Sequence, residues 1–199
     1  MEVTAALVKQ LRDKTGVGMM KCKAALVQAE GDLAKAEKHL RKQGEAAAAK
    51  KAGRATGEGL VTSYIHTGGK IGVLLEVNCE TDFAARSEDF QELVHGISMH
   101  IAAAAPRFAR REDVSEALLQ DEREIARDQA LQSGKPEKIV DRIVEGKLEK
   151  FFGEACLLEQ PYVKDPDKTV GQLITDAVAK IGENIQVRRF VRFVLGEEA

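Results

Sequence analysis

The sequence predicts an α+β fold, in which three N-terminal helices precede a core of helices packed on a small antiparallel sheet. Apolar residues recur at helical spacing up to about residue 50. The period then changes to two, and two strand-like runs flank Thr67-Gly68-Gly69, which is a hairpin signal. Helical spacing returns afterwards, and the chain closes on the β-rich run IQVRRFVRFVLGE.

The composition is that of an ordinary soluble globular chain. Hydrophobic residues make up 44% and charged residues 31% of the 199 residues, and the formal net charge is −2. This balance gives the chain as a whole no attraction to nucleic acid or acidic lipid. No apolar run approaches the roughly 20 residues that span a bilayer, and the first residues do not form a secretory signal. We therefore expect neither direct nucleic-acid contact nor a membrane span.

Cysteine and histidine usage indicates the compartment and the absence of a metal site. Cys22, Cys79 and Cys156 are odd in number and widely spaced, which argues against a disulfide framework. They favour a reducing compartment, so we expect a cytoplasmic protein. No CxxC or HxxxH pair occurs, and His95 and His100 are five residues apart, which is the wrong spacing to hold a metal from one helix face.

Residues 1–52 are predicted to form the first domain. Thr4 is a suitable N-cap for its first helix. Asp32 caps the third helix, which we expect to end at Gly44. The glycines in the following stretch, EAAAAKKAGRATGEG, do not sustain a helix comfortably, so this stretch is predicted to link the first domain to residues 53–199.

Met19 and Met20 begin the second helix of this small domain. In one interpretation, one of them packs inside and the other covers a turn. In the other, at least one is exposed and used for contact, because methionine adapts to many partner surfaces. The sequence leaves both interpretations open.

The sheet of the second domain is predicted to have one apolar face and one mixed face. In the second strand, KIGVLLEVNC, alternate residues form the apolar face, and the other face could be covered by a helix or by another subunit. On the closing strand, three apolar residues can also face inward. The residues predicted to face inward on these two strands are Ile71, Val73, Leu75, Val77, Val187, Val191 and Phe193.

The core helices are predicted from their apolar stripes. One helix follows the cap residue Ser87, another covers residues 112–132, a third follows Pro136, and a fourth lies in TVGQLITDAVAKIGEN. The stripe of the first helix contains Phe90, Leu93, Val94, Ile97 and Ile101. The apolar positions of the second include Val114, Leu118, Ile125 and Leu131. The buried side of the third is expected to carry Ile139, Ile143, Val144, Leu148 and either Phe151 or Phe152.

The sequence contains no motif for catalysis. Neither a G-x-S-x-G, an H-E-x-x-H nor a dinucleotide fingerprint occurs. Cys79 lies among acidic residues, which raise the pKa of a thiol and make it a poor nucleophile. We therefore predict a binding or regulatory protein and not an enzyme, with a cysteine-dependent enzyme that uses Cys79 as an alternative.

The stretch NCETDFAARSEDF contains two phenylalanines with different surroundings. Phe90 belongs to the apolar stripe of the helix that follows Ser87. Phe83 lies between the strand and Ser87, outside both periodic patterns. Periodicity alone leaves Phe83 as either a stray core residue or an exposed anchor for another protein.

Long stretches of this chain closely resemble the translation elongation factor Ts family. The resemblance is carried by LRDKTGVGMMKCKAALVQAEGD, IGVLLEVNCETDFAARSEDF and SGKPEKIVDRIVEGKLEKFFGEACLLEQPYVKD, in the order of the family. It implies a ubiquitin-associated-like three-helix domain followed by an α+β core. It also implies a guanine-nucleotide exchange factor for elongation factor Tu, the GTPase that delivers aminoacyl-tRNA to the ribosome.

The resemblance also implies particular contact residues. The family motif TDF matches Thr81, Asp82 and Phe83, whose tip enters the GTPase and disturbs its magnesium and phosphate site so that GDP leaves. The N-terminal contact residues of the family match Arg12, Met19 and Met20. A helix histidine of the family matches His100 more weakly.

The resemblance is to the short form of the family, which carries a single core repeat. Such a chain is expected to form a homodimer, and the mixed face of the sheet fits this expectation. No cofactor of its own is expected, because GDP, GTP and magnesium belong to the GTPase. An adaptor that binds ubiquitin-like or peptide partners through the three-helix domain is the alternative from another class.

Overall fold

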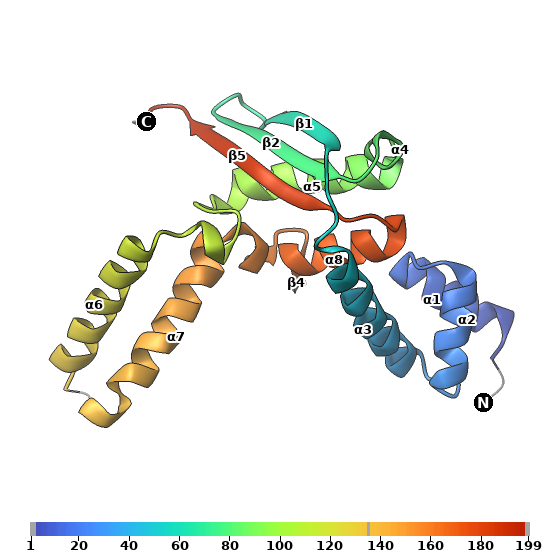
Figure 1. Cartoon of the computed structure of the whole chain (residues 1–199), viewed down its shortest axis with the longest axis horizontal. Helices are drawn as coiled ribbons and strands as arrows, with labels where there is room; N and C mark the ends of the chain where they lie inside the picture. Colours follow the sequence, from blue (N-terminus) through green and yellow to red (C-terminus); the bar gives the residue numbers. More distant parts are fainter. Residues whose placement is uncertain (1–2, 135, 198–199) are drawn as a thin grey trace. The chain divides into compact units, whose positions relative to one another are not determined.

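The computed structural model describes residues 3–134 and 136–197 (Figure 1). The fold is α+β, as predicted. The α-helices are α1 (Ala5–Thr15), α2 (Met19–Gln28), α3 (Leu33–Lys51), α4 (Asp82–Ala85), α5 (Glu88–Ala104), α6 (Glu116–Gln132), α7 (Glu137–Ala155) and α8 (Val170–Ile181). The strands are β1 (Glu58–Ile65), β2 (Ile71–Cys79), β3 (Pro161–Tyr162), β4 (Asp165–Thr169) and β5 (Gln186–Val194).

The chain divides into two compact units, each built from separate stretches of sequence. The first contains residues up to Val61, 76–94 and 173–186, and the second contains 62–75, 95–172 and residues from Val187 onward. The predicted domain boundary after residue 52 stays a prediction. Within the part of the chain that the structure describes, no helix has both the length and the apolar character needed to cross a membrane.

Helices α1 and α3 have the N-caps that the sequence predicted. The Thr4 hydroxyl accepts a hydrogen bond from the Leu7 amide at 3.3 Å, and the Asp32 carboxylate accepts one from the Lys35 amide at 3.0 Å. Gly16 ends α1 with a φ of 67°, which glycine adopts without strain. The common core of α1 to α3 consists of Val8, Leu11, Cys22, Ala25, Leu26, Ala29, Ala36 and Leu40.

The prediction that the third helix ends at Gly44 is wrong, because α3 continues to Lys51. Gly44 is buried inside the helix, and a Cβ atom placed there would lie 3.4 Å from the Cβ of Ala179 on α8. The glycine therefore marks a close approach of two helices. The alanines and lysines that follow are strong helix formers, which offset the roughly 1 kcal/mol that one glycine costs.

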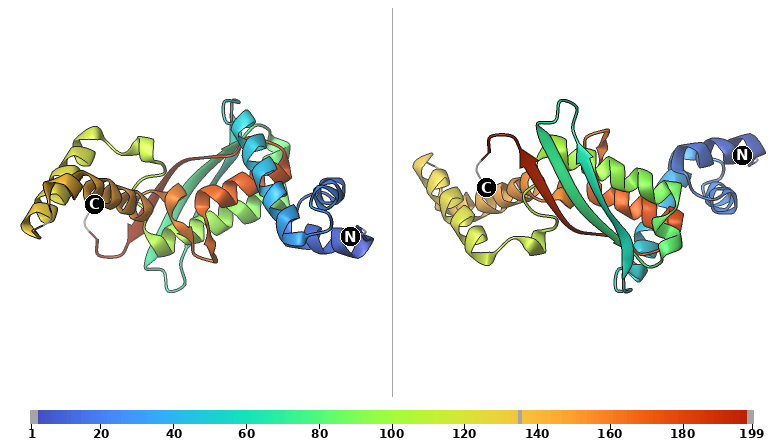
Figure 2. Two further views of the ribbon diagram at one scale, coloured as in Figure 1. Left: turned by 90° about the horizontal axis from the view of Figure 1, so that it is seen from below. Right: turned by 90° about the horizontal axis from the view of Figure 1, so that it is seen from above.

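The three-stranded sheet has the order β1-β2-β5, and β1 and β2 form the predicted hairpin. Val73, Leu75 and Val77 are buried as predicted, and so is Val187 at the start of β5. Helix α5 runs along one face of the sheet, and no helix of the described residues covers the opposite face (Figure 2). The predicted stripe of α5 is confirmed, since Phe90, Leu93, Val94, Ile97 and Ile101 are all buried.

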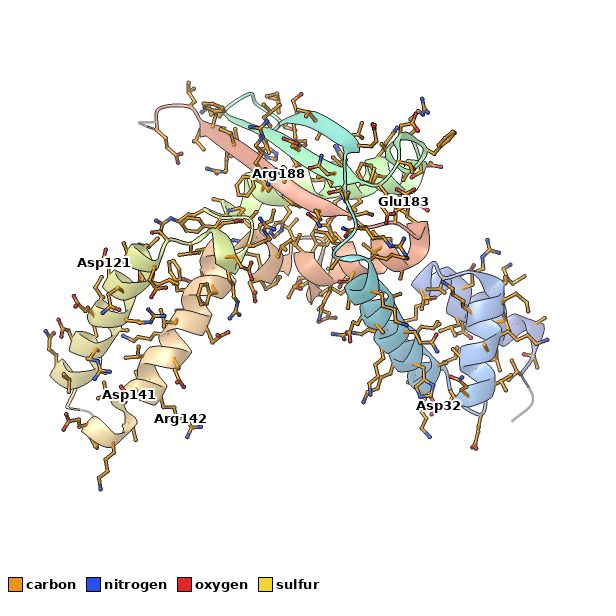
Figure 3. All side chains as sticks on the ribbon, in the orientation of Figure 1. Asp32, Asp121, Asp141, Arg142, Glu183 and Arg188 are labelled. Atoms are coloured by element: carbon orange, nitrogen blue, oxygen red, sulfur yellow. The ribbon has the colours of Figure 1, made fainter. Side chains whose placement is uncertain are left out.

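The second half of β5 has its faces reversed relative to the prediction. Val191 and Phe193 were expected to face inward, but they are 48% and 67% exposed. Two consecutive exposed arginines, the first of them Arg188 (labelled in Figure 3), interrupt the alternation. Beyond them the other set of side chains faces inward, and the Arg192 guanidinium donates to the Ala102 carbonyl at 3.3 Å.

Helices α6 and α7 lie side by side as an antiparallel pair (Figure 1). The sequence predicted both helices but not their pairing, and it misplaced part of their contact stripe. Alanine side chains let the two helices approach closely, so the pair is centred on Ala126, Ala130, Val140 and Val144. Ile139, which was predicted on the buried side of α7, is exposed instead, and so are Ile125 and Leu131 among the apolar positions of α6.

Candidate functional site

Helix α4 is a single helical turn, separated from the end of β2 only by Glu80 and Thr81. Asp82 and Phe83 occupy the outer side of this turn, and the Phe83 side chain is 79% exposed. Ala84 and Ala85 are buried at 7% and 4% exposure. Because the inner side of the turn carries only methyl groups, it packs closely while the larger side chains point outward. We call residues 81–85 the tip.

Thr81 fixes the base of the tip through its backbone and its side chain. Its hydroxyl accepts a hydrogen bond from the Ala84 amide at 3.3 Å, which caps α4. Its carbonyl accepts from the Ala85 amide at 3.2 Å and from the Cys79 thiol at 3.1 Å. Each hydrogen-bonding group of Thr81 therefore has a partner, once the contacts with Glu183 are included.

Glu183, in the loop between α8 and β5, binds the base of the tip from a distant part of the sequence (labelled in Figure 3). One carboxylate oxygen accepts from the backbone amides of Glu80 at 3.1 Å and Thr81 at 3.0 Å. The other accepts from the Thr81 hydroxyl at 2.6 Å. Hydrogen bonds to an ionised carboxylate are stronger than neutral ones, so this loop restrains the tip firmly.

The contact between the two loops is reciprocal. The Glu80 carboxylate accepts from the Asn184 amide at 2.7 Å and from the Arg54 guanidinium at 3.4 Å. The buried Asn184 side chain donates to the carbonyls of Ala52 at 3.3 Å and Arg54 at 2.9 Å. The segment that leaves α3 and the base of the tip are therefore held by the same pair of residues, Glu183 and Asn184.

Arg86 contacts both outward side chains of the tip. It forms an ion pair with Asp82 one turn earlier, and its guanidinium lies 5.5 Å from the centroid of the Phe83 ring. The arginine side chain is 67% exposed, so water and salt weaken both interactions. Arg86 therefore orients the two side chains without burying them.

The residues matched in the N-terminal helices are accessible. Met19 is 53% exposed and Met20 is 78% exposed, and Arg12 is exposed near the end of α1. The interpretation that one methionine packs inside is wrong. Both methionines lie on the surface at the start of α2, where they are accessible to another molecule.

His100 has surroundings that differ from those of the other matched residues. It is fully buried, its Nε2 atom donates to the Gln160 side-chain oxygen at 2.9 Å, and its Nδ1 atom accepts from the Val163 amide at 3.2 Å. Burial lowers its pKa below the ordinary 6.5. This arrangement gives His100 an internal role and argues against direct contact with a partner.

The cysteines are not arranged for nucleophilic chemistry. Cys22, Cys79 and Cys156 are free thiols, and each is fully buried. Burial, followed by the charge of Glu183, raises the pKa of Cys79, so the reactive thiolate is disfavoured. Among the described residues, no group of three metal-ligating side chains is close enough to hold an ion. These observations argue against the alternative of a cysteine-dependent enzyme.

The uncovered face of the sheet carries apolar side chains from all three strands. We call this set the open face. Leu74 on β2 belongs to it, which agrees with the mixed second face that the sequence predicted. Its exposed apolar residues, with exposures from 48% to 67%, are Val61, Ile65, Leu74, Val191 and Phe193.

These features define a class of protein that acts by binding. An aromatic side chain and a carboxylate are presented on a turn whose base is rigidly held, which suits insertion into a partner. The site shows no pairing of nucleophile and base among these residues.

The comparisons with known proteins identify the family. The model of the family described as Elongation factor TS matches residues 2–197. The chain is 63% identical over 195 residues to an Elongation factor Ts of Heliobacterium modesticaldum, covering 98% of this chain and 91% of that protein. The Elongation factor Ts of Solibacter usitatus is 60% identical, with 98% of this chain and 92% of that protein covered. The Elongation factor Ts of Moorella thermoacetica is 58% identical, with 98% of this chain and 96% of that protein covered. The chain belongs to the elongation factor Ts family, and this membership supports a nucleotide-exchange role in translation elongation.

Two residues beside the tip were missed by the sequence analysis. Arg86 follows Asp82 by four positions, and the usual helical spacing of opposite charges could have indicated their pairing. Glu183 is more than one hundred residues from the tip, so no local pattern could have indicated its contact with Thr81.

Proposed function

We propose that this chain binds elongation factor Tu in its GDP form and accelerates the release of GDP, so that GTP can bind. The observation that carries the proposal is Phe83, a large aromatic side chain that is 79% exposed on a turn whose base is fixed by hydrogen bonds. An exposed phenylalanine contributes nothing to the core, and buried aromatic anchors dominate many protein interfaces. Family membership supplies the class of partner.

The proposed mechanism needs no covalent step. Phe83 enters the GTPase, where burial of its ring drives association. Asp82 brings a carboxylate towards a site that needs magnesium and phosphates, and it competes with them or rearranges the ligands of the ion. By thermodynamic linkage, nucleotide must weaken binding of this chain by the same factor by which this chain weakens nucleotide binding.

The experiment is to measure the release of a fluorescent GDP analogue from elongation factor Tu with the wild-type chain and with Phe83→Ala. We expect Phe83→Ala to lose most of the stimulation, by about thirtyfold if the ring contributes the roughly 2 kcal/mol typical of a hot spot. Val163→Ala, which shortens another exposed apolar side chain, is the control and should keep full activity. A folded Phe83→Ala chain with normal exchange contradicts the insertion of this residue.

We propose that Arg12, Met19 and Met20 form a second contact with the GTPase. They lie on exposed parts of α1 and α2, and methionine packs well on surfaces of varied shape. The combined change of both methionines to alanine should raise the concentration needed for half-maximal exchange and leave the maximal rate near that of the wild type. The proposed role requires no cofactor in this chain and places it in the cytoplasm with its partner.

We also propose that two copies of this chain associate through the open face. Five apolar side chains on adjacent strands are exposed there, and a second copy would remove them from water. Light scattering of the purified protein should give twice the chain mass. Phe193→Asp should shift the protein to the monomer, because it places a carboxylate in the apolar face. A wild-type monomer at high micromolar concentration contradicts this proposal.

A further inference from the structure

The charge and position of Glu183 suggest more than a structural role. Its carboxylate accepts three hydrogen bonds, and all of them come from Glu80 and Thr81, immediately before Asp82 and Phe83. Thr81 in turn caps the turn that carries Phe83. The direction in which the aromatic ring points therefore depends on backbone atoms that Glu183 holds.

We propose that Glu183 is a positioning residue for nucleotide exchange, which fixes the tip in the direction that insertion into the GTPase requires. This inference rests on the proposed exchange function. A tip that is already ordered loses less conformational entropy on insertion, so more of the contact energy of Phe83 acts on the nucleotide site. Glu183 itself stays at the base of the tip and acts through Thr81.

The chemistry of the contact explains why a carboxylate is needed. Two backbone amides and one hydroxyl point at Glu183, and all three are donors. Glutamine has the same shape and can keep its oxygen on the two backbone amides, but it lacks the negative charge that strengthens these hydrogen bonds, and its NH2 group would force the Thr81 hydroxyl to accept instead of donate. Aspartate keeps both acceptor oxygens on a shorter side chain. Glu183→Gln should therefore loosen the tip more than Glu183→Asp, which provides a conservative variant.

The test combines two measurements on the full chain. Hydrogen exchange of the free protein, followed by mass spectrometry, should show faster exchange over residues 80–86 in Glu183→Gln, with α1 to α3 unchanged. In the GDP-release assay with elongation factor Tu, Glu183→Gln should lower the maximal rate about tenfold, equivalent to about 1.4 kcal/mol. The concentration for half-maximal exchange should change less than the maximal rate. Glu183→Asp should have a maximal rate between those of Glu183→Gln and the wild type.

The controls separate this inference from the proposed function. Glu124→Gln, which changes an exposed carboxylate on α6, should leave both measurements unchanged. Unchanged hydrogen exchange of the tip in Glu183→Gln overturns the positioning role. The role is also overturned if the tip is loosened but the variant accelerates GDP release from elongation factor Tu as much as the wild type does. If the wild-type chain does not accelerate GDP release from elongation factor Tu, the exchange function itself is contradicted. If the wild type and Glu183→Gln are equally active, only the role of Glu183 is contradicted.

Discussion

Phe83 and Phe90 are seven residues apart and have opposite surroundings. Phe83 is 79% exposed on α4, whereas Phe90 is completely buried on α5. Both helices begin after a hydroxyl cap, since Thr81 accepts from the Ala84 amide and Ser87 accepts from the Phe90 amide at 3.3 Å. The caps are alike, so the difference arises from what lies beneath each turn.

This comparison shows how one short stretch separates folding from recognition. In α4 the inner positions are Ala84 and Ala85, which leave no room for a large side chain beneath the turn. In α5 the inner positions carry Phe90 and the rest of the apolar stripe. Stability should therefore depend on Phe90 and partner binding on Phe83, and the effects of substitutions should divide in the same way.

The largest expected effect on stability is that of Phe90→Ala. Removing a buried phenylalanine leaves a cavity and should lower the free energy of unfolding by about 3–5 kcal/mol. Chemical denaturation followed by circular dichroism measures this change. If the alanine variant does not fold, Phe90→Leu should still fold and lose less stability, because it removes fewer buried atoms and leaves a smaller cavity. GDP release by the folded fraction should match that of the wild type.

Phe83→Ala is the converse substitution. Its free energy of unfolding should stay within about 0.5 kcal/mol of that of the wild type, because the side chain contacts mainly water and Arg86. Its effect should be confined to GDP release, measured as described above. A loss of stability comparable with that of Phe90→Ala would place Phe83 in the core and remove the contrast between the two residues.

Much of this contrast could be predicted from the sequence. The apolar stripe containing Phe90 and the Ser87 cap follow from local spacing, and both are confirmed. The position of Phe83 outside both periodic patterns was also visible, but periodicity could not decide whether it was exposed. The two inner alanines decide it, and their burial is a property of the folded chain.

The errors of the sequence analysis have a common physical cause. Gly44 lies inside the helix at a close approach to Ala179, more than one hundred residues away, and the sequence analysis took it for a helix end. Phe193 is exposed because two consecutive arginines shift the alternation of β5. Glu183 reaches Thr81 across the fold. Each of these depends on a partner or an irregularity that local propensity does not encode.

His100 should behave like Phe90 and not like Phe83. His100→Leu removes the acceptor of the Val163 amide and the donor to Gln160, which should cost about 1–3 kcal/mol of stability. Denaturant unfolding at pH 7.5 measures this loss. Maximal GDP release by the folded variant should equal that of the wild type. A folded His100→Leu chain with normal stability and weak exchange would restore the contact role that the resemblance assigned to it.

The pH dependence of stability gives an independent test of His100. Burial disfavours the charged form of His100, so its pKa lies below 6.5. Protonation would also place a hydrogen on Nδ1, which already accepts from the Val163 amide. In the unfolded chain His100 is protonated near pH 6.5, whereas in the folded chain it stays neutral to a lower pH. The free energy of unfolding should therefore fall as the pH drops below about 6.5, and His100→Leu should lose that part of the pH dependence.

Arg86→Ala should have the smallest effect. The ion pair of Arg86 with Asp82 is exposed, and such pairs contribute about 0.3–0.5 kcal/mol in helices. We expect GDP release to slow by about twofold, with a smaller difference from the wild type at high salt. Arg86→Lys should keep the ion pair but pack less well on Phe83, because lysine lacks the planar guanidinium.

The comparison between Arg86 and Glu183 gives this small effect its meaning. Both residues contact the tip. Arg86 is exposed to water and contacts the outward side chains of the tip, whereas Glu183 is hydrogen-bonded to the backbone at its base. If Arg86→Ala slows GDP release as much as Glu183→Gln, the direction of Phe83 depends on its exposed neighbour and not on the base of the tip. If Arg86→Ala accelerates release, the ion pair restrains Asp82 in the free chain and must open before the carboxylate can act.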